Sequence, residues 1–170
     1  MLLTTRSLPR GGTASALPLA SASPKAARVA STAAFTSGFR PPVALATACP
    51  GAVVDAVDVN PRALRLCADN ARAQRVGDRV RPLLPEDADP QARYDELWSN
   101  PPIRIGKQAL HELLLTWLPR LKPDGVARLV VGRNLGADSL QRWLIDQGWA
   151  CERTASAKGF RVFAVSAAAG

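Results

Sequence analysis

The sequence has 170 residues, and 47% of them are hydrophobic, which is enough for one domain with a core. Its formal net charge of +8 and its pI near 10.4 favour a polyanionic partner such as RNA. No two of its three cysteines form a Cys-x-x-Cys pair, and no apolar run approaches the roughly 18 residues of a membrane span. These features argue against a metal centre, a redox centre and a membrane-embedded chain. They favour a cytoplasmic protein with reduced thiols.

The charge is distributed unevenly along the chain. The first 54 residues contain five basic residues and no acidic one. The remaining 17 basic and 14 acidic residues give a net charge of only +3. Residues 13–42 are rich in Ala, Ser, Thr and Pro and show no hydrophobic periodicity. We therefore expect residues 1–41 to form an atypical segment that is disordered or translated out of frame, and residues 42–167 to form the folded domain.

Strand and helix patterns alternate after this segment. A helix is expected to begin at Pro42, and a second follows Asn60, which suits a helix cap, and Pro61, which suits the first turn. This alternation predicts an α/β, Rossmann-like, doubly wound and mainly parallel sheet that ends in an antiparallel hairpin. The further expected strands are 52–60, 78–84, 94–99, 125–132, 150–157 and 160–166, and the further expected helices cover 110–118 and 137–148.

Two polar residues follow expected strands, where ligands bind in such sheets. Asp58 lies at the end of a buried strand and precedes a capped helix. Its carboxylate is suited to accept hydrogen bonds from the hydroxyls of a nucleoside ribose. It is equally suited to cap the helix alongside Asn60. Position alone weights these two interpretations evenly.

Asn100 stands before Pro101 and Pro102 in the stretch "WSNPPIRIGK". A carboxamide oxygen and a neighbouring backbone carbonyl can each accept an N–H of an exocyclic amine, which turns the nitrogen lone pair towards an electrophile. Pro101 would hold that carbonyl on a stiff segment because proline fixes its backbone. A simple strand-ending turn explains most isolated Asn-Pro-Pro stretches. The position beside Asp58 favours the functional interpretation.

The residues after the prolines are basic. Arg104 and Lys107 are suited to contact RNA phosphates, although Lys107 would also fit a solvated position in the first helical turn. His111 is the only histidine, and "HELLL" lacks the second histidine of a zinc motif. We expect His111 to lie on a helix surface and expect no metal site.

The stretches "DVNPRALRLCADNA", "YDELWSNPPIRIGKQALHELL" and "KGFRV" resemble the small-domain class I methyltransferases that use S-adenosylmethionine, and most closely the ribosomal RNA guanine-N2 methyltransferases. The resemblance covers about residues 43 to 165. It implies an S-adenosylmethionine cofactor and ribosomal RNA as partner. We also expect a cytoplasmic location and, as the favoured state, a monomer. By this resemblance Asn100 and Pro101 would bind the target amine, Pro102, Ile103, Arg104 and Lys107 would contact the substrate, and Asp58, Asp87 and Gly38 would contact the cofactor.

The sequence departs from this family at its beginning. The family opens with an apolar strand, an acid and a glycine-rich loop, whereas "STAAFTSGFRP" offers one glycine, Gly38, and no acid. A frameshifted gene is the first interpretation, a divergent loop the second and an organelle transit peptide the third. A degraded first strand would leave its two central neighbours with unpaired edges, and the small residues of "AARVASTAAF" would replace it poorly. We expect weak cofactor binding and reduced stability.

Three functional hypotheses follow from these observations. The first is a methyltransferase that modifies a guanine amine in ribosomal RNA. The second is a catalytically inactive remnant that binds RNA through its basic turn. The third keeps the enzyme but changes the substrate to a protein glutamine or a small-molecule amine, because Asn-Pro-Pro alone does not select among amines.

Overall fold

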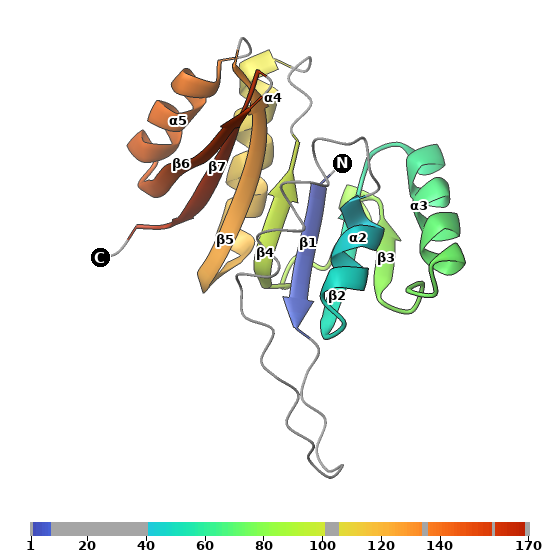
Figure 1. Cartoon of the computed structure of the whole chain (residues 1–170). Coiled ribbons are helices and arrows are strands. Elements are labelled where there is room, and N and C mark those ends of the chain that lie inside the picture. The colour runs from blue at the N-terminus through green and yellow to red at the C-terminus, as the bar shows by residue number, and fades with distance from the viewer. Residues whose placement is uncertain (1, 8–40, 101–105, 134–135, 158, 169–170) are drawn as a thin grey trace.

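The computed structural model describes residues 2–7, 41–100, 106–133, 136–157 and 159–168. Their strands form one seven-stranded sheet in the order β3-β2-β1-β4-β5-β7-β6, with helices on both faces (Figure 1). The expected Rossmann-like α/β fold is confirmed. The strands are β1 Leu2–Ser7, β2 Ala52–Val57, β3 Val80–Leu83, β4 Tyr94–Ser99, β5 Leu121–Gly132, β6 Trp149–Ala157 and β7 Phe160–Ala167. The helices are α2 Pro41–Ala48, α3 Pro61–Ala73, α4 Gly106–Trp117 and α5 Ala137–Asp146, with short 3-10 helices η1 Pro85–Asp87 and η3 Leu118–Arg120.

The local sequence signals explain where the helices begin and end. The Asn60 side chain accepts a hydrogen bond from the backbone N–H of Arg62 at 3.0 Å, and Pro61 takes the first position of α3. Helix α5 ends before Gly148, whose φ of +84° only glycine adopts without strain. None of the helices in the described part of the chain is long and apolar enough to cross a membrane.

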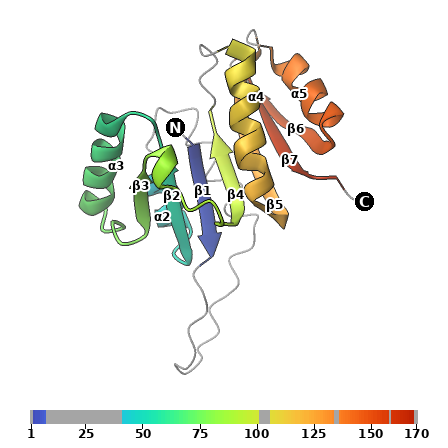
Figure 2. The same cartoon turned by 180° about the vertical axis from the view of Figure 1, so that it is seen from behind.

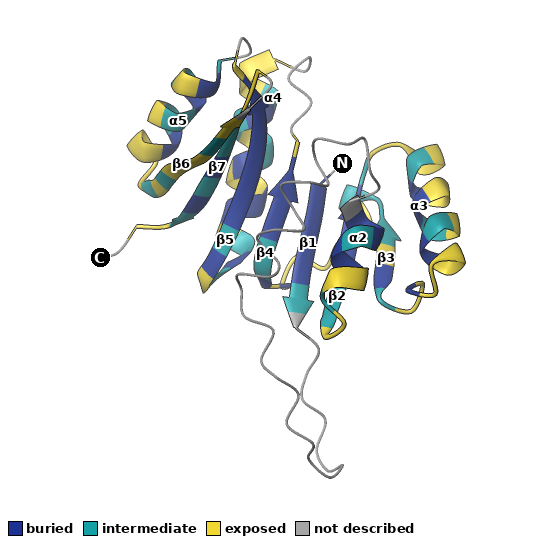
Figure 3. Cartoon of the chain, viewed as in Figure 1, coloured by how far each residue is buried: buried dark blue, intermediate teal, exposed yellow. Residues whose placement is uncertain are grey.

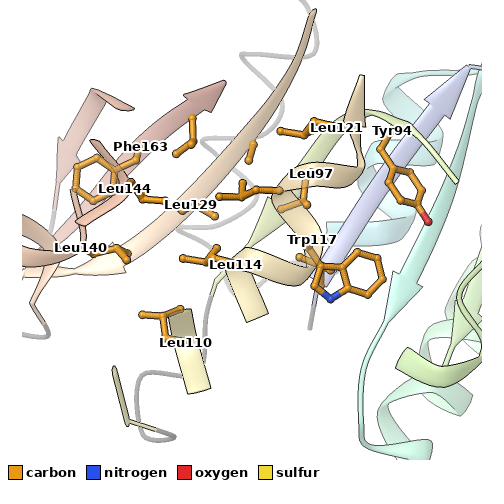
Figure 4. Packing of buried hydrophobic residues seen from close by; sticks show 14 of the residues in the cluster. Tyr94, Leu97, Leu110, Leu114, Trp117, Leu121, Leu129, Leu140, Leu144 and Phe163 are labelled. Atoms are coloured by element: carbon orange, nitrogen blue, oxygen red, sulfur yellow. The ribbon is translucent and has the colours of Figure 1, made fainter. Parts of the chain in front are cut away.

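The larger hydrophobic core lies between the sheet and helices α4 and α5. Figure 2, the view from behind, shows these two helices on the same face of the sheet. Tyr94 and Leu97 of β4 contribute to it together with Leu114 and Trp117 of α4, and Figure 4 shows their packing. Leu144 of α5 lies in the same cluster and is fully buried. This core packs β4, β5 and β7 against α4 and α5. The carboxyl ends of β4 and β5 therefore extend from a rigid part of the sheet.

The second core lies on the opposite face, under helices α2 and α3. It joins Val54 and Ala56 of β2 to Ala46 of α2 and Ala71 of α3, and it reaches across the sheet to Trp98. Figure 3 shows that the buried residues concentrate on the central strands and the inner sides of the helices. The sheet is therefore covered on both faces around its central strands, as expected for a doubly wound fold.

Strand β1 lies at the centre of the sheet. This corrects two expectations, because residues 2–7 form a strand where we expected a disordered segment, and the central strands do not have unpaired edges. It runs antiparallel to both neighbours, with Thr4 in register with Asp55 on β2 and with Leu97 on β4. The candidate substitute strand at residues 26–35 lies outside the described residues. Among the six pairings of this sheet, only β2–β3 and β4–β5 are parallel. The sheet is therefore mixed, where we expected a mainly parallel one, because β1 and β7 run against the other five strands.

A buried carboxylate, that of Asp55, lies next to Tyr94 of the larger core. Asp55 is 2% exposed, and Arg81 of β3 donates two hydrogen bonds to it, both at 2.7 Å. The hydroxyl of Tyr94 lies 3.3 Å from the same carboxylate. Burial is the main cause that raises the pKa of Tyr94, so its hydroxyl stays protonated as a donor. These contacts satisfy a charge that would otherwise be costly to bury.

Replacing Arg81 with Met is expected to lower the free energy of unfolding by about 2 kcal/mol. The loss is smaller than for a fully buried pair because 43% of the Arg81 side chain is exposed. The matched control is Arg72→Met, which breaks an ion pair to Asp69 whose two side chains are 71% and 64% exposed. Urea denaturation should show little effect for the control. Equal effects of the two variants would contradict a structural role for the buried pair.

The cysteines are free thiols, as expected. Burial raises the pKa of all three and brings that of Cys151 to about 11. They are therefore protonated and weakly reactive at neutral pH. Within the described residues, no cluster of His, Cys, Asp and Glu is suited to hold a metal ion.

Candidate functional site

The two candidate polar residues lie at the same edge of the sheet. Leu2 of β1 is in register with Val57, the last residue of β2, and with Ser99, the last residue of β4. Asp58 and Asn100 follow these two residues directly, so they flank the amino end of β1. Two strand spacings separate them, which amounts to about 10 Å. The expectation that the strand order brings them together is met.

Asp58 is held in a defined orientation. Its backbone N–H donates to the carbonyl of Leu83 on β3 at 3.2 Å, and its Oδ1 accepts from the backbone N–H of Asn60 at 2.9 Å. The capping interpretation is therefore correct. A carboxylate has about four acceptor positions, so capping by Asp58 and a role in binding ribose hydroxyls do not exclude each other.

Asn100 is exposed at the end of a strand that is firmly anchored. Ser99 and Trp98 before it are each 2% exposed. The indole Nε1 of Trp98 donates to Glu96 Oε2 at 2.9 Å, and the guanidinium carbon of Arg128 lies 5.2 Å from the indole centroid. These contacts fix the strand up to its last residue. Pro101, Pro102, Ile103 and Arg104 lie outside the described residues.

Lys107 is exposed in the first turn of α4, at the same edge. One turn further along, His111 is half-buried because its ring stacks on Trp143 of α5, with centroids 3.8 Å apart and planes at 5°. Burial, followed by the charge of Lys107, lowers the pKa of His111. His111 therefore packs between two helices, where we expected a surface residue.

The expected cofactor contacts at the other strand ends are only partly described. Asp87 is exposed and ends η1, just beyond β3, and its backbone N–H donates to Leu84 at 3.1 Å. Because β3 lies beside β2, Asp87 and Asp58 follow neighbouring strands. Gly38 lies outside the described residues.

Three residues at this edge were not identified from the sequence. Val59 follows Asp58 and is 79% exposed, and Phe160 begins β7 and is 47% exposed. Arg133 is exposed after β5, and its backbone N–H donates to Gly159 at 2.7 Å. Val59 was detectable as an apolar residue between an acid and a helix cap. Phe160 was assigned only to a hairpin strand.

A family model described as the methyltransferase small domain matches residues 42–164. The chain belongs to this family. One solved structure similar to this chain in fold is described as the S-adenosylmethionine-dependent methyltransferase SibL.

Three solved structures illustrate the likeness of fold. The mitomycin 7-O-methyltransferase MmcR matches with a TM-score of 0.61 and 14% identity over 74% of this chain and 44% of that chain. The ribosomal protein L11 methylase of Lactobacillus delbrueckii subsp. bulgaricus gives 0.57 and 18%, over 74% and 62%. The precorrin-6y C5,15-methyltransferase of Geobacter metallireducens GS-15 gives 0.54 and 21%, over 74% and 72%. The match thus spans less than two thirds of the first two of these proteins.

The family implies S-adenosylmethionine as the cofactor. The described residues suit its nucleoside half, because Asp58 presents an oriented carboxylate and Val59 an exposed apolar side chain at the end of β2. The direction of β1 does not suit the methionine half of the cofactor. In a parallel sheet the central strand would leave the carboxyl edge through a turn of backbone N–H groups, whereas β1 meets this edge with its amino end.

We therefore keep the prediction that this chain binds S-adenosylmethionine weakly. Isothermal titration calorimetry should give a dissociation constant well above the micromolar range. Asp58→Ala should weaken the remaining binding further, because it removes the ribose acceptor. A micromolar constant for the unaltered chain would contradict the prediction.

Proposed function

We propose that this protein is a methyltransferase that acts on an exocyclic amine, with guanine N2 of ribosomal RNA as the target. The observation that carries the proposal is Asn100, an exposed carboxamide that directly follows an anchored strand at the carboxyl edge. It stands across β1 from Asp58, on the side that faces α4 and Lys107.

Each residue has a simple role in this proposal. The carboxamide oxygen of Asn100 accepts one N–H of the amine, and the backbone carbonyl of Pro101 accepts the other. These bonds direct the nitrogen lone pair and stabilise the positive charge that develops on nitrogen. Asp58 holds the ribose of the cofactor, which supplies an electrophilic methyl group when bound. Transfer would form an N–C bond as the bond between the methyl group and the cofactor's sulfur breaks, with the neutral thioether as leaving group, and the amine would then lose a proton to water, so no strong base is required.

The net charge of the chain supports RNA as the partner. The formal charge of +8 favours a polyanion, although residues 55–170 contribute only +3 of it, and Lys107, seven residues after Asn100, places an exposed cation at the same edge. The resemblance to guanine-N2 enzymes rests on "SNPPIRIGK", which is longer and more specific than Asn-Pro-Pro alone.

A catalytically inactive RNA-binding protein is the second candidate. The observation that favours it is the direction of β1, whose amino end meets the edge where the cofactor would bind. Such a protein would bind RNA through its basic residues and would not transfer a methyl group. Methylation of a protein glutamine or a small-molecule amine is the third candidate, because the same two acceptors serve any amine.

The test is incorporation of tritiated methyl groups from S-adenosylmethionine into ribosomal RNA that lacks modifications, followed by nucleoside analysis. The proposal expects labelled N2-methylguanosine. RNA binding without incorporation supports the inactive protein. Label in a protein or small-molecule fraction alone supports the third candidate and overturns the first.

A further inference from the structure

Phe160 is the one aromatic among the large hydrophobic side chains that the described part of the chain exposes, with 47% of its surface accessible. The other four are the aliphatic Val59, Leu66, Leu115 and Ile145. A single exposed hydrophobic side chain needs no explanation by itself. Phe160 is different because of its place at the candidate active edge.

The sheet register gives that place. Phe160 is in register with Gly132, the last residue of β5, whereas Ser99 on β4 is in register with Leu129. Asn100 therefore lies in the row of Val130, and Phe160 lies two rows further towards the carboxyl edge. Two rows and two strand spacings put their backbones about 12 Å apart. The beginning of β7 and the end of β5 thus share one edge with the end of β4, which Asn100 follows (Figure 1).

The surroundings of Phe160 leave its ring accessible. Its neighbour on β5 is Gly132, which has no side chain. The turn before it is tied to β5 by the 2.7 Å hydrogen bond from the Arg133 N–H to the Gly159 carbonyl. The next residue, Arg161, pairs with Asp138 of α5, and alternation along the strand turns Phe160 to the opposite face. The backbone of Phe160 is thus held in place, while its aromatic ring stays accessible.

We propose that Phe160 is a stacking platform for an unpaired base next to the target nucleotide. This inference rests on the proposed function and adds that the substrate is single-stranded RNA at this point. A separation of about 12 Å exceeds the reach of one base but suits a neighbouring nucleotide in an extended strand. Every base has an aromatic face, so such stacking is tolerant of sequence. The exposed Arg133 beside it supplies a cation for the connecting phosphate.

The experiment measures binding of a fluorescein-labelled, unstructured RNA of about 12 nucleotides by fluorescence anisotropy. Phe160→Ala should weaken binding about tenfold, and Phe160→Trp should retain it, because base–aromatic stacking is lost in the first and kept in the second. Leu115→Ala is the matched control, since Leu115 is 49% exposed on α4. It should bind as tightly as the unaltered chain.

Salt dependence separates stacking from charge. Phe160→Ala should leave the slope of log affinity against log salt unchanged, whereas Arg133→Gln should reduce it by about one unit. Unchanged affinity of Phe160→Ala, or equal losses in Phe160→Ala and Leu115→Ala, would overturn the inference. Failure of the unaltered chain to bind or methylate any RNA would instead overturn the proposed function, so the two failures are distinct.

Discussion

Replacing Thr4 with proline is expected to unfold most of this domain. Thr4 is fully buried at the middle of β1, between Asp55 on β2 and Leu97 on β4. Proline removes one backbone donor, leaves its acceptor unpaired in the core and clashes within the strand. The cost is roughly 3 kcal/mol or more, a large part of the stability of a small domain.

The matched control for this change is Thr4→Val at the same position. Valine is β-branched like threonine and keeps every backbone hydrogen bond, so it should cost much less stability than proline. Urea denaturation followed by tryptophan fluorescence compares the two variants, since Trp98 lies on the strand paired to β1. If the proline variant were as stable as the valine variant, β1 would not be the central strand.

The second large effect concerns Asn100. Asn100→Ala removes the side-chain acceptor for the target amine, and the rate of methyl transfer should fall by about a hundredfold or more. Because Asn100 is exposed, the change should leave the thermal unfolding midpoint nearly unaltered. Initial rates of tritiated methyl transfer to ribosomal RNA, at saturating substrate, provide the measurement.

Asn100→Asp is the informative companion because a carboxylate retains oxygen acceptors at the same position. Its rate should lie above that of Asn100→Ala. S-adenosylmethionine binding should be the same in both variants, since Asn100 is assigned to the target and not to the cofactor. Equal rates for the alanine variant and the unaltered chain would exclude Asn100 as the amine acceptor.

The elements after residue 41 follow from local signals. Helix α3 begins at Pro61 after its Asn60 cap, and α4 carries Leu110 and Leu114 on its buried face, as the helical period predicts. Strand β5 begins at Leu121, four residues before the expected start. The early start was not recognisable because Lys122–Gly125 look like turn residues. In the structure they form a bulge, since Tyr94 pairs with Leu121 and Glu96 pairs with Val126.

Strand β1 was not predictable in the same way. The segment "LLTTRS" is short and carries no cap or turn signal, and its place depends on pairing with distant strands. The rule that ligands bind beyond the carboxyl ends of strands pointed to Asp58 and Asn100, which lie at one edge. No such rule pointed to Phe160, because exposure depends on the small neighbours that the sheet register brings beside it.

The position of β1 also has a consequence for how the chain folds. Its partners on β2 and β4 lie about 50 and 90 residues further along the sequence. The strands of the pairs β2–β3 and β4–β5 are close in sequence. Among the described strands, only β1 connects these two pairs into one sheet. During synthesis β1 emerges first and must wait for β4 before the sheet can close. Because late, long-range pairing slows folding and exposes strand edges, chaperone dependence and aggregation during expression are the expected behaviour of this protein.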